Sequence, residues 1–195
     1  MSSDWKTLPN AITLIRLALI PVFLALELGE RHLWALIAFA FALGSDWLDG
    51  LLARLLRQRS HLGGVLDPVA DKLLVFTALV GLVWQRALPV WILGLVIARD
   101  ALMLFGAAVV AHKRLDLPTQ PSRIGKYATF ALGITVLGAL ANEVVQSPRV
   151  RAYTAVACFF AGLCVAISTV QYLSRFGYLF FAPSQRSSSH KPQKW

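Results

Sequence analysis

The feature that most constrains this chain is a succession of six apolar runs separated by short polar or turn-forming stretches. A helix needs about 20 consecutive apolar residues to cross the ~30 Å hydrocarbon core of a bilayer. The composition suits this, since 57% of the sequence is hydrophobic and only 15% is charged. Backbone groups in lipid must be satisfied within their own segment, so we expect an all-α integral membrane bundle of six transmembrane helices. The expected spans are 11–28, 33–45 (continuing as a helix through residue 54), 68–84, 89–111, 122–145 and 151–181.

The basic residues lie at the ends of these apolar runs. The formal net charge is +9, a balance also found in nucleic-acid-binding proteins. Charges that flank apolar runs instead indicate membrane topology, so we expect no nucleic-acid partner. The ends richer in Lys and Arg should be cytoplasmic, which places both termini and the link between the second and third spans inside. The richer ends hold Lys6, Arg54, Arg57, Arg59, Lys113, Arg114, Arg123, Lys126, Arg186, Lys191 and Lys194, and the poorer ends hold Arg31, Arg86, Arg149 and Arg151.

The chain has the organisation of one membrane domain with a tail. Residues 1–181 form the expected domain, entered by a short polar lead with Asn10 placed to cap the first helix. No clear small-residue cleavage site follows the first apolar run, so we expect that run to be a retained helix. Residues 182–195 are rich in Ser, Gln and Lys, which predicts a disordered basic tail. Cys158 and Cys164 would be about 9 Å apart along a helix, which predicts packing residues without a disulfide.

Four of the ten acidic residues lie between positions 46 and 71, at the boundary of two apolar runs. Asp46 and Asp49 share one face of a helix, and Asp67 and Asp71 share one face of the next. Acidic residues near helix ends are often solvated or paired with Arg. Four carboxylates brought together would repel each other strongly, and hard divalent cations with oxygen ligands would relieve that repulsion. We therefore predict a divalent-metal site at this boundary.

The spacing of these residues is D-x2-D-G-x2-A-R-x8-G-x3-D-x3-D, with every gap fixed. It resembles the signature of the CDP-alcohol phosphatidyltransferases. The match covers a small part of the chain, but the number of apolar runs and the Leu8-Pro9-Asn10 start of the first run also look like this family. The pattern is met by Asp46, Asp49, Gly50, Ala53, Arg54, Gly63, Asp67 and Asp71.

The resemblance implies an enzyme that transfers a phosphatidyl group from CDP-diacylglycerol to an alcohol, with release of CMP. It also implies a multi-pass protein of the bacterial inner membrane, with its active site facing the cytoplasm. The partners that it implies are membrane lipids and a second copy of the chain in a homodimer. Two Mg²⁺ or Mn²⁺ ions would neutralise the pyrophosphate. By similarity, Asp46, Asp49 and Asp67 hold metal, and Asp71 is the general base that also touches metal. The residues implied in binding the CDP moiety are Asp49, Gly50, Ala53, Arg54 and Gly63.

Other charged residues are candidates for binding the acceptor. Arg123 and Lys126 share a face at the cytoplasmic start of the fifth span, where a basic pair suits an anionic acceptor and is equally typical of ordinary flanking charge. Arg99 lies deep in the fourth span, where intramembrane charges are functional candidates. The roles of Arg16 and Asp100 stay open, because Arg16 either faces the acidic motif or snorkels to the surface.

The acceptor itself is the least constrained part of the prediction. The stretches "LPNAITLIRLALIPVF" and "DWLDGLLAR…LDPVADK" look like family members that use sn-glycerol 3-phosphate and make phosphatidylglycerol phosphate. The stretch "ARDALML" looks more like the CMP-forming cardiolipin synthases, which use phosphatidylglycerol. A non-enzyme alternative is a membrane transporter with an acidic binding site, although the inverted repeats typical of transporters are not evident.

Overall fold

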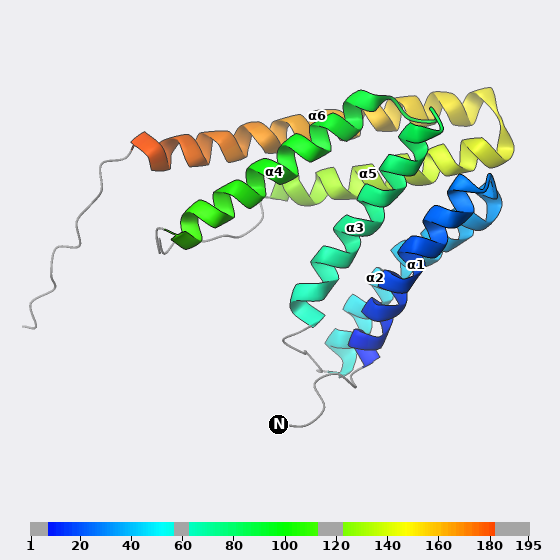
Figure 1. Cartoon of the computed structure of the whole chain (residues 1–195), viewed down its shortest axis with the longest axis horizontal. Coiled ribbons are helices and arrows are strands. Elements are labelled where there is room, and N and C mark those ends of the chain that lie inside the picture. The colour runs from blue at the N-terminus through cyan, green and yellow to red at the C-terminus, as the bar shows by residue number, and fades with distance from the viewer. Residues whose placement is uncertain (1–7, 57–62, 113–122, 182–195) are drawn as a thin grey trace, which may run out of the picture.

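The computed structural model describes residues 8–56, 63–112 and 123–181, and all of its regular structure in these ranges is α-helical (Figure 1). The all-α fold class is thus confirmed for the described residues. The six helices are α1 (Leu8–Leu28), α2 (His32–Leu56), α3 (Gly63–Trp84), α4 (Val90–His112), α5 (Arg123–Val145) and α6 (Pro148–Phe181).

The helices pack around one apolar core. The helices α5 and α6 lie side by side, α4 packs on α6, and α1 contacts both α2 and α3 (Figure 1). Both α2 and α3 also contact α5, which therefore joins the two groups of helices. The rings of Phe23 on α1 and Phe39 on α2 are 5.6 Å apart, and both side chains are fully buried. Leu79, Ile92 and Leu140 bring α3, α4 and α5 into the same core.

Three tight turns connect α1 to α2, α3 to α4, and α5 to α6. Each contains one non-glycine residue in the left-handed region, with φ values of 57° at Glu30, 62° at Arg86 and 50° at Gln146. The backbone N–H groups of Glu30 and Arg31 donate to carbonyls near the end of α1, which satisfies carbonyls that the helix leaves open. The helices alternate in direction, so the C-terminal ends of α2 and α4 and the N-terminal ends of α3 and α5 lie away from these turns, and we call this the motif end.

Four helix boundaries differ from the predicted ones by more than one residue. The helix α1 starts at Leu8, so Asn10 lies inside its first turn and the predicted cap is wrong. Pro9 is tolerated there because the first turn of a helix needs no N–H from it. The helix α6 starts at Pro148, a position that favours proline for the same reason, so only two residues separate it from α5. The helix α3 starts at Gly63, five residues before the predicted start at position 68. The helix α2 ends at Leu56, two residues after the predicted end at position 54.

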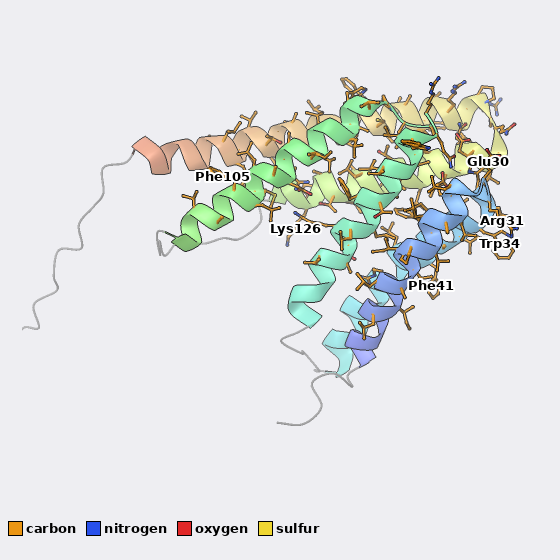
Figure 2. The ribbon with its side chains drawn as sticks, viewed as in Figure 1. Glu30, Arg31, Trp34, Phe41, Phe105 and Lys126 are labelled. Atoms are coloured by element: carbon orange, nitrogen blue, oxygen red, sulfur yellow. The ribbon has the colours of Figure 1, made fainter. Side chains whose placement is uncertain are left out.

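The outer surface of the bundle is apolar. Trp34 is 59% exposed, Leu104 71% and Phe130 69%, on three different helices. Figure 2 shows Trp34 directed away from the bundle, beside Glu30 and Arg31 at the α1–α2 turn. Within the described ranges, two helical segments are long and apolar enough to cross a membrane, Ile124–Val145 and Pro148–Ser174. Such a large exposed apolar surface is typical of a protein that contacts lipid.

Two further predictions concern the cysteines and the tail. Cys158 and Cys164 are both free, as expected from their helical separation. The predicted tail, residues 182–195, lies outside the described residues.

Candidate active site

The acidic motif is divided between α2 and α3, which both contact α1. Its first half is on the C-terminal part of α2 and its second half on the N-terminal part of α3, on either side of residues 57–62. Of the eight motif residues, Asp71 is the one whose side chain the structure describes. The α2 positions are Asp46, Asp49, Gly50, Ala53 and Arg54, and the α3 positions are Gly63, Asp67 and Asp71.

A buried arginine of α1 connects the two halves of the motif. Arg16 Nη1 is 2.5 Å from Asp71 Oδ1, while Arg16 Nη2 donates to Ser45 Oγ at 3.4 Å. Ser45 comes directly before Asp46 in the chain, and its hydroxyl donates to the carbonyl of Ala42 at 2.8 Å. One guanidinium therefore connects the middle of α2 to the N-terminal half of α3 through its two terminal nitrogens.

The burial of Arg16 decides the question that its sequence position left open. Its side chain is 0% exposed, whereas that of Asp71 is 33% exposed. A buried charge costs free energy unless it is paired and hydrogen-bonded, and this one is. Arg16 therefore faces the motif and does not snorkel. The sequence carried a signal for this role, since an arginine inside an apolar run must find a partner.

A second ion pair links α3 to α4 next to the first. Lys72 Nζ lies 3.3 Å from Asp100 Oδ1, with side-chain exposures of 46% and 28%. Neighbouring residues on a helix point about 100° apart, so Asp71 meets α1 while Lys72 meets α4. We had not singled out Lys72 from the sequence, and the role of Asp100 had stayed open.

The predicted acceptor residues gather where α4 meets the start of α5. Arg99 is 5% exposed, and its Nη2 donates to the backbone carbonyl of Gly125 at 3.2 Å. Lys126, the next residue along α5, is exposed, and Figure 2 places it near the N-terminal end of that helix. Arg123 is the first residue of α5, and its side chain is not among those described. The structure thus brings Arg99 and Lys126 to the same junction, which is one turn of α5 from Arg123.

Divalent metal ions are the predicted partners of the motif carboxylates. Among the side chains that the structure describes, no three His, Cys, Asp or Glu residues form a metal-binding group. The predicted ligands Asp46, Asp49 and Asp67 are outside that set, and their backbone positions are on α2 and α3. Arg16 of α1 contacts both of these helices, and carboxylate oxygens are the ligands that Mg²⁺ prefers. The described contacts therefore place the backbone positions of the predicted ligands on two helices that Arg16 connects.

A separate polar cluster lies at the opposite end of the bundle, and sequence reasoning missed it. Glu27 is fully buried, with Oε2 3.8 Å from His32 Nδ1. The side-chain amide of Gln85 donates to the backbone carbonyl of Glu27 and so ties the end of α3 to α1. A groove of about 420 Å³ beside it is lined by His32, Gln85 and Glu143, among others. This cluster is remote from the acidic motif and takes no part in the site.

Comparison with known proteins agrees with the motif. The profile of the CDP-alcohol phosphatidyltransferase family matches residues 6–170. A CMP-forming cardiolipin synthase of Streptomyces coelicolor is 41% identical over 132 residues, which are 65% of this chain and 61% of the relative. A CDP-diacylglycerol–glycerol-3-phosphate 3-phosphatidyltransferase of Bacillus subtilis is 34% identical over 193 residues, with 86% of this chain and 94% of the relative covered. The human CMP-forming cardiolipin synthase is 35% identical over 156 residues, which are 78% of this chain and 52% of the relative.

The chain thus spans about three fifths of the Streptomyces protein and nearly the whole of the Bacillus protein. The relatives carry the names of both reactions that the sequence suggested. With a family match over most of its length and the complete acidic motif on α2 and α3, this chain belongs to the CDP-alcohol phosphatidyltransferase family.

Proposed function

We propose that this protein is an integral membrane enzyme that transfers a phosphatidyl group from CDP-diacylglycerol to the hydroxyl of a phosphate-bearing alcohol. The preferred acceptor is sn-glycerol 3-phosphate, and the product is then phosphatidylglycerol phosphate. The observation that carries the proposal is the contact of Arg16 with both Ser45 and Asp71, because it joins the two helices of the complete family motif.

The roles of the motif residues follow from the chemistry of the transfer. Asp46, Asp49 and Asp67 hold Mg²⁺ or Mn²⁺, which when bound neutralises the pyrophosphate and polarises its phosphorus. Asp49, Gly50, Ala53, Arg54 and Gly63 hold the CDP moiety, where the small residues leave room for the ligand to approach the backbone.

The proton of the acceptor goes to Asp71. The acceptor oxygen forms a bond to the lipid-side phosphorus as the bond from that phosphorus to CMP breaks, and Asp71 receives the hydroxyl proton. Arg16 fixes the direction of the Asp71 carboxylate. The Asp71 side chain is 33% exposed, so the acceptor hydroxyl or a metal can approach the carboxylate from the open side.

The membrane assignment extends the same proposal. Six spans, both termini in the cytoplasm and a motif end facing the cytoplasm would let the water-soluble CMP leave directly. The apolar surface on several helices and the charge distribution of the sequence support this topology.

Cardiolipin synthesis from phosphatidylglycerol is the second candidate, favoured by the 41% identity to the Streptomyces protein. The greater coverage of the Bacillus relative favours glycerol 3-phosphate. The transporter alternative has no support from these relatives, whose names are those of synthases and transferases.

One panel of assays tests the proposal. Purified protein in detergent is given CDP-diacylglycerol and Mg²⁺ with glycerol 3-phosphate or phosphatidylglycerol, and CMP release is measured. We expect CMP release with glycerol 3-phosphate. Release with phosphatidylglycerol alone would establish the second candidate, and no release with either acceptor would contradict the proposed reaction.

A further inference from the structure

The proposed reaction needs a site for the phosphate of its acceptor, and the described residues offer a set of cations for it. Arg16 is already committed to Asp71 and Ser45. The cations beyond it are Lys72 on α3, Arg99 on α4 and Lys126 on α5. These three come from three different helices, and the contacts of Lys72 and Arg99 connect the helices in that order.

Lys72 is the member of this set that lies next to the proposed base. It follows Asp71 directly, and its ammonium reaches toward α4, where it meets Asp100. The two side chains leave neighbouring positions of α3 about 100° apart, so an acceptor with its phosphate on this ammonium would have to extend around the helix for its hydroxyl to reach Asp71. Both side chains are partly exposed, so a ligand has access to both.

The pairing of Lys72 with Asp100 is the kind that another anion can replace. Lys72 is 46% exposed and Asp100 28%, and ion pairs open to solvent contribute little to stability. The Arg16–Asp71 pair differs, because the guanidinium is fully buried. Exchange of Asp100 for a phosphate oxygen at Lys72 keeps the ammonium paired and costs little.

Arg99, the residue before Asp100 on α4, has a donor that is not used by the described residues. It is 5% exposed, it donates to the Gly125 carbonyl, and its Nε–H has no hydrogen-bond partner among the described residues. A buried donor without a partner costs free energy, and a bound ligand oxygen would satisfy it. Lys72, Arg99 and Lys126 are cations and Asp100 is a carboxylate, so these four side chains together have a net positive charge.

From this arrangement we propose that Lys72 binds the phosphate of the acceptor and that Asp100 occupies Lys72 until the acceptor arrives. Lys72 thus selects phosphate-bearing alcohols, with Arg99 beside it. The phosphate belongs either to a small soluble monoester, glycerol 3-phosphate, or to a lipid diester, phosphatidylglycerol. This inference rests on the proposed phosphatidyl transfer, but its binding step is measurable without turnover.

The test compares acceptor kinetics in Lys72→Gln, Lys72→Arg and Asp100→Asn at saturating CDP-diacylglycerol. Lys72→Gln should raise the KM for the phosphate acceptor by about tenfold and change the KM for CDP-diacylglycerol by less than about twofold. Lys72→Arg should largely rescue this KM, since it keeps the charge. Asp100→Asn should lower the acceptor KM by roughly threefold, because it removes the competing carboxylate.

Asp100→Asn separates binding from structure. A residue pair that only holds α3 against α4 would weaken the enzyme when either partner is changed, whereas the proposal requires opposite effects on acceptor KM. Arg151→Gln is the matched control for lost charge, because Arg151 is exposed on α6 at the opposite end. An unchanged acceptor KM in Lys72→Gln, or a raised one in Asp100→Asn, would overturn the inference.

Direct binding keeps this inference distinct from the proposed reaction. Titration of the protein with glycerol 3-phosphate in the absence of donor should give a binding isotherm that Lys72→Gln weakens, and vesicles containing phosphatidylglycerol provide the lipid arm. If binding depends on Lys72 but no CMP is released with any acceptor, the proposed reaction is contradicted and the phosphate site at Lys72 is still supported. Turnover with an acceptor KM that is the same in the wild type and in Lys72→Gln would support the proposed reaction and contradict the phosphate site at Lys72.

Discussion

Arg16 and Asp71 are 55 positions apart in the chain, yet Arg16 Nη1 lies 2.5 Å from Asp71 Oδ1. The arginine is fully buried and the aspartate is partly open, so the pair has one side in the core and one side toward the proposed active site. This asymmetry suits a positioning contact, in which the buried cation fixes the direction of a carboxylate that is itself partly exposed.

The first prediction concerns this pair. Arg16→Gln should lower turnover by at least about tenfold and destabilise the fold by roughly 2 kcal/mol, a buried-pair cost reduced for the partial exposure of Asp71. Combined with Asp71→Asn, it should cause little further loss of turnover, because the arginine acts through that carboxylate. Activity of both single variants and the double variant, with melting temperatures in detergent, gives the measurement. Additive losses of turnover would show that Arg16 acts independently of Asp71.

The contact of Arg16 with Ser45 gives a matched control. Its length of 3.4 Å makes it a weak hydrogen bond. Ser45→Ala should therefore change turnover by less than about threefold, and this comparison separates the ion pair from the second contact.

The second prediction concerns Asp71 as the base. Asp71→Asn keeps the size of the side chain and removes its charge, so turnover should fall by at least about 100-fold, the scale of a lost general base. The affinity for CDP-diacylglycerol should fall less, because the other three motif carboxylates remain. Single-turnover rates with bound donor would show this directly, and a near-normal rate would refute the assignment.

The third prediction concerns metal. Activity should be abolished by EDTA and restored by added Mg²⁺ or Mn²⁺, because four carboxylates at fixed spacing are expected to hold these ions. Asp46→Asn should raise the Mg²⁺ concentration needed for half-maximal rate, since a charged ligand is lost. Full turnover in the presence of chelator would contradict the proposed role of the metal.

The fourth prediction concerns the close contact of α5 with α6. A Cβ placed on Gly138 would lie 2.9 Å from Thr154 Oγ1, and Thr154 is buried with its hydroxyl bonded to the Val150 carbonyl. Gly138→Ala should therefore lower the melting temperature, at a cost of about 1–3 kcal/mol. Gly94→Ala on α4 meets no atom within 4 Å and should stabilise slightly, because alanine is the better helix former. Equal changes of the melting temperature in the two variants would show that α5 and α6 can move apart enough to accommodate the added methyl group.

The fifth prediction concerns topology. In a protein with Cys158 and Cys164 replaced by alanine, single cysteines at positions 57 and 191 should react with impermeant reagents only from the cytoplasmic side. A cysteine at position 86, in the α3–α4 turn, should react only from the outside. Labelling of position 57 from outside would reverse the proposed orientation of the motif end.

The sequence alone determined the helical class and the motif. Six apolar runs with few charges predict helices, because the backbone N–H and C=O groups of an apolar run in lipid must form hydrogen bonds within that run. The fixed spacing of the motif predicted that Asp67 and Asp71 share one helix face. It also indicated the family, and the family match over residues 6–170 confirmed that assignment. Helix ends such as Leu8 and Pro148 were less predictable, because local capping signals compete within a few residues.

Only the tertiary structure decided which charges meet. The sequence shows an arginine inside the first apolar run, but helix periodicity gives no information on which neighbour it faces, so Arg16 stayed ambiguous until Asp71 and Ser45 were seen beside it. Lys72 looked like an ordinary residue after the motif, and its meeting with Asp100 depends on how α3 and α4 pack. Local pattern fixes the face of one helix, whereas contacts between distant residues depend on the packing of several helices at once.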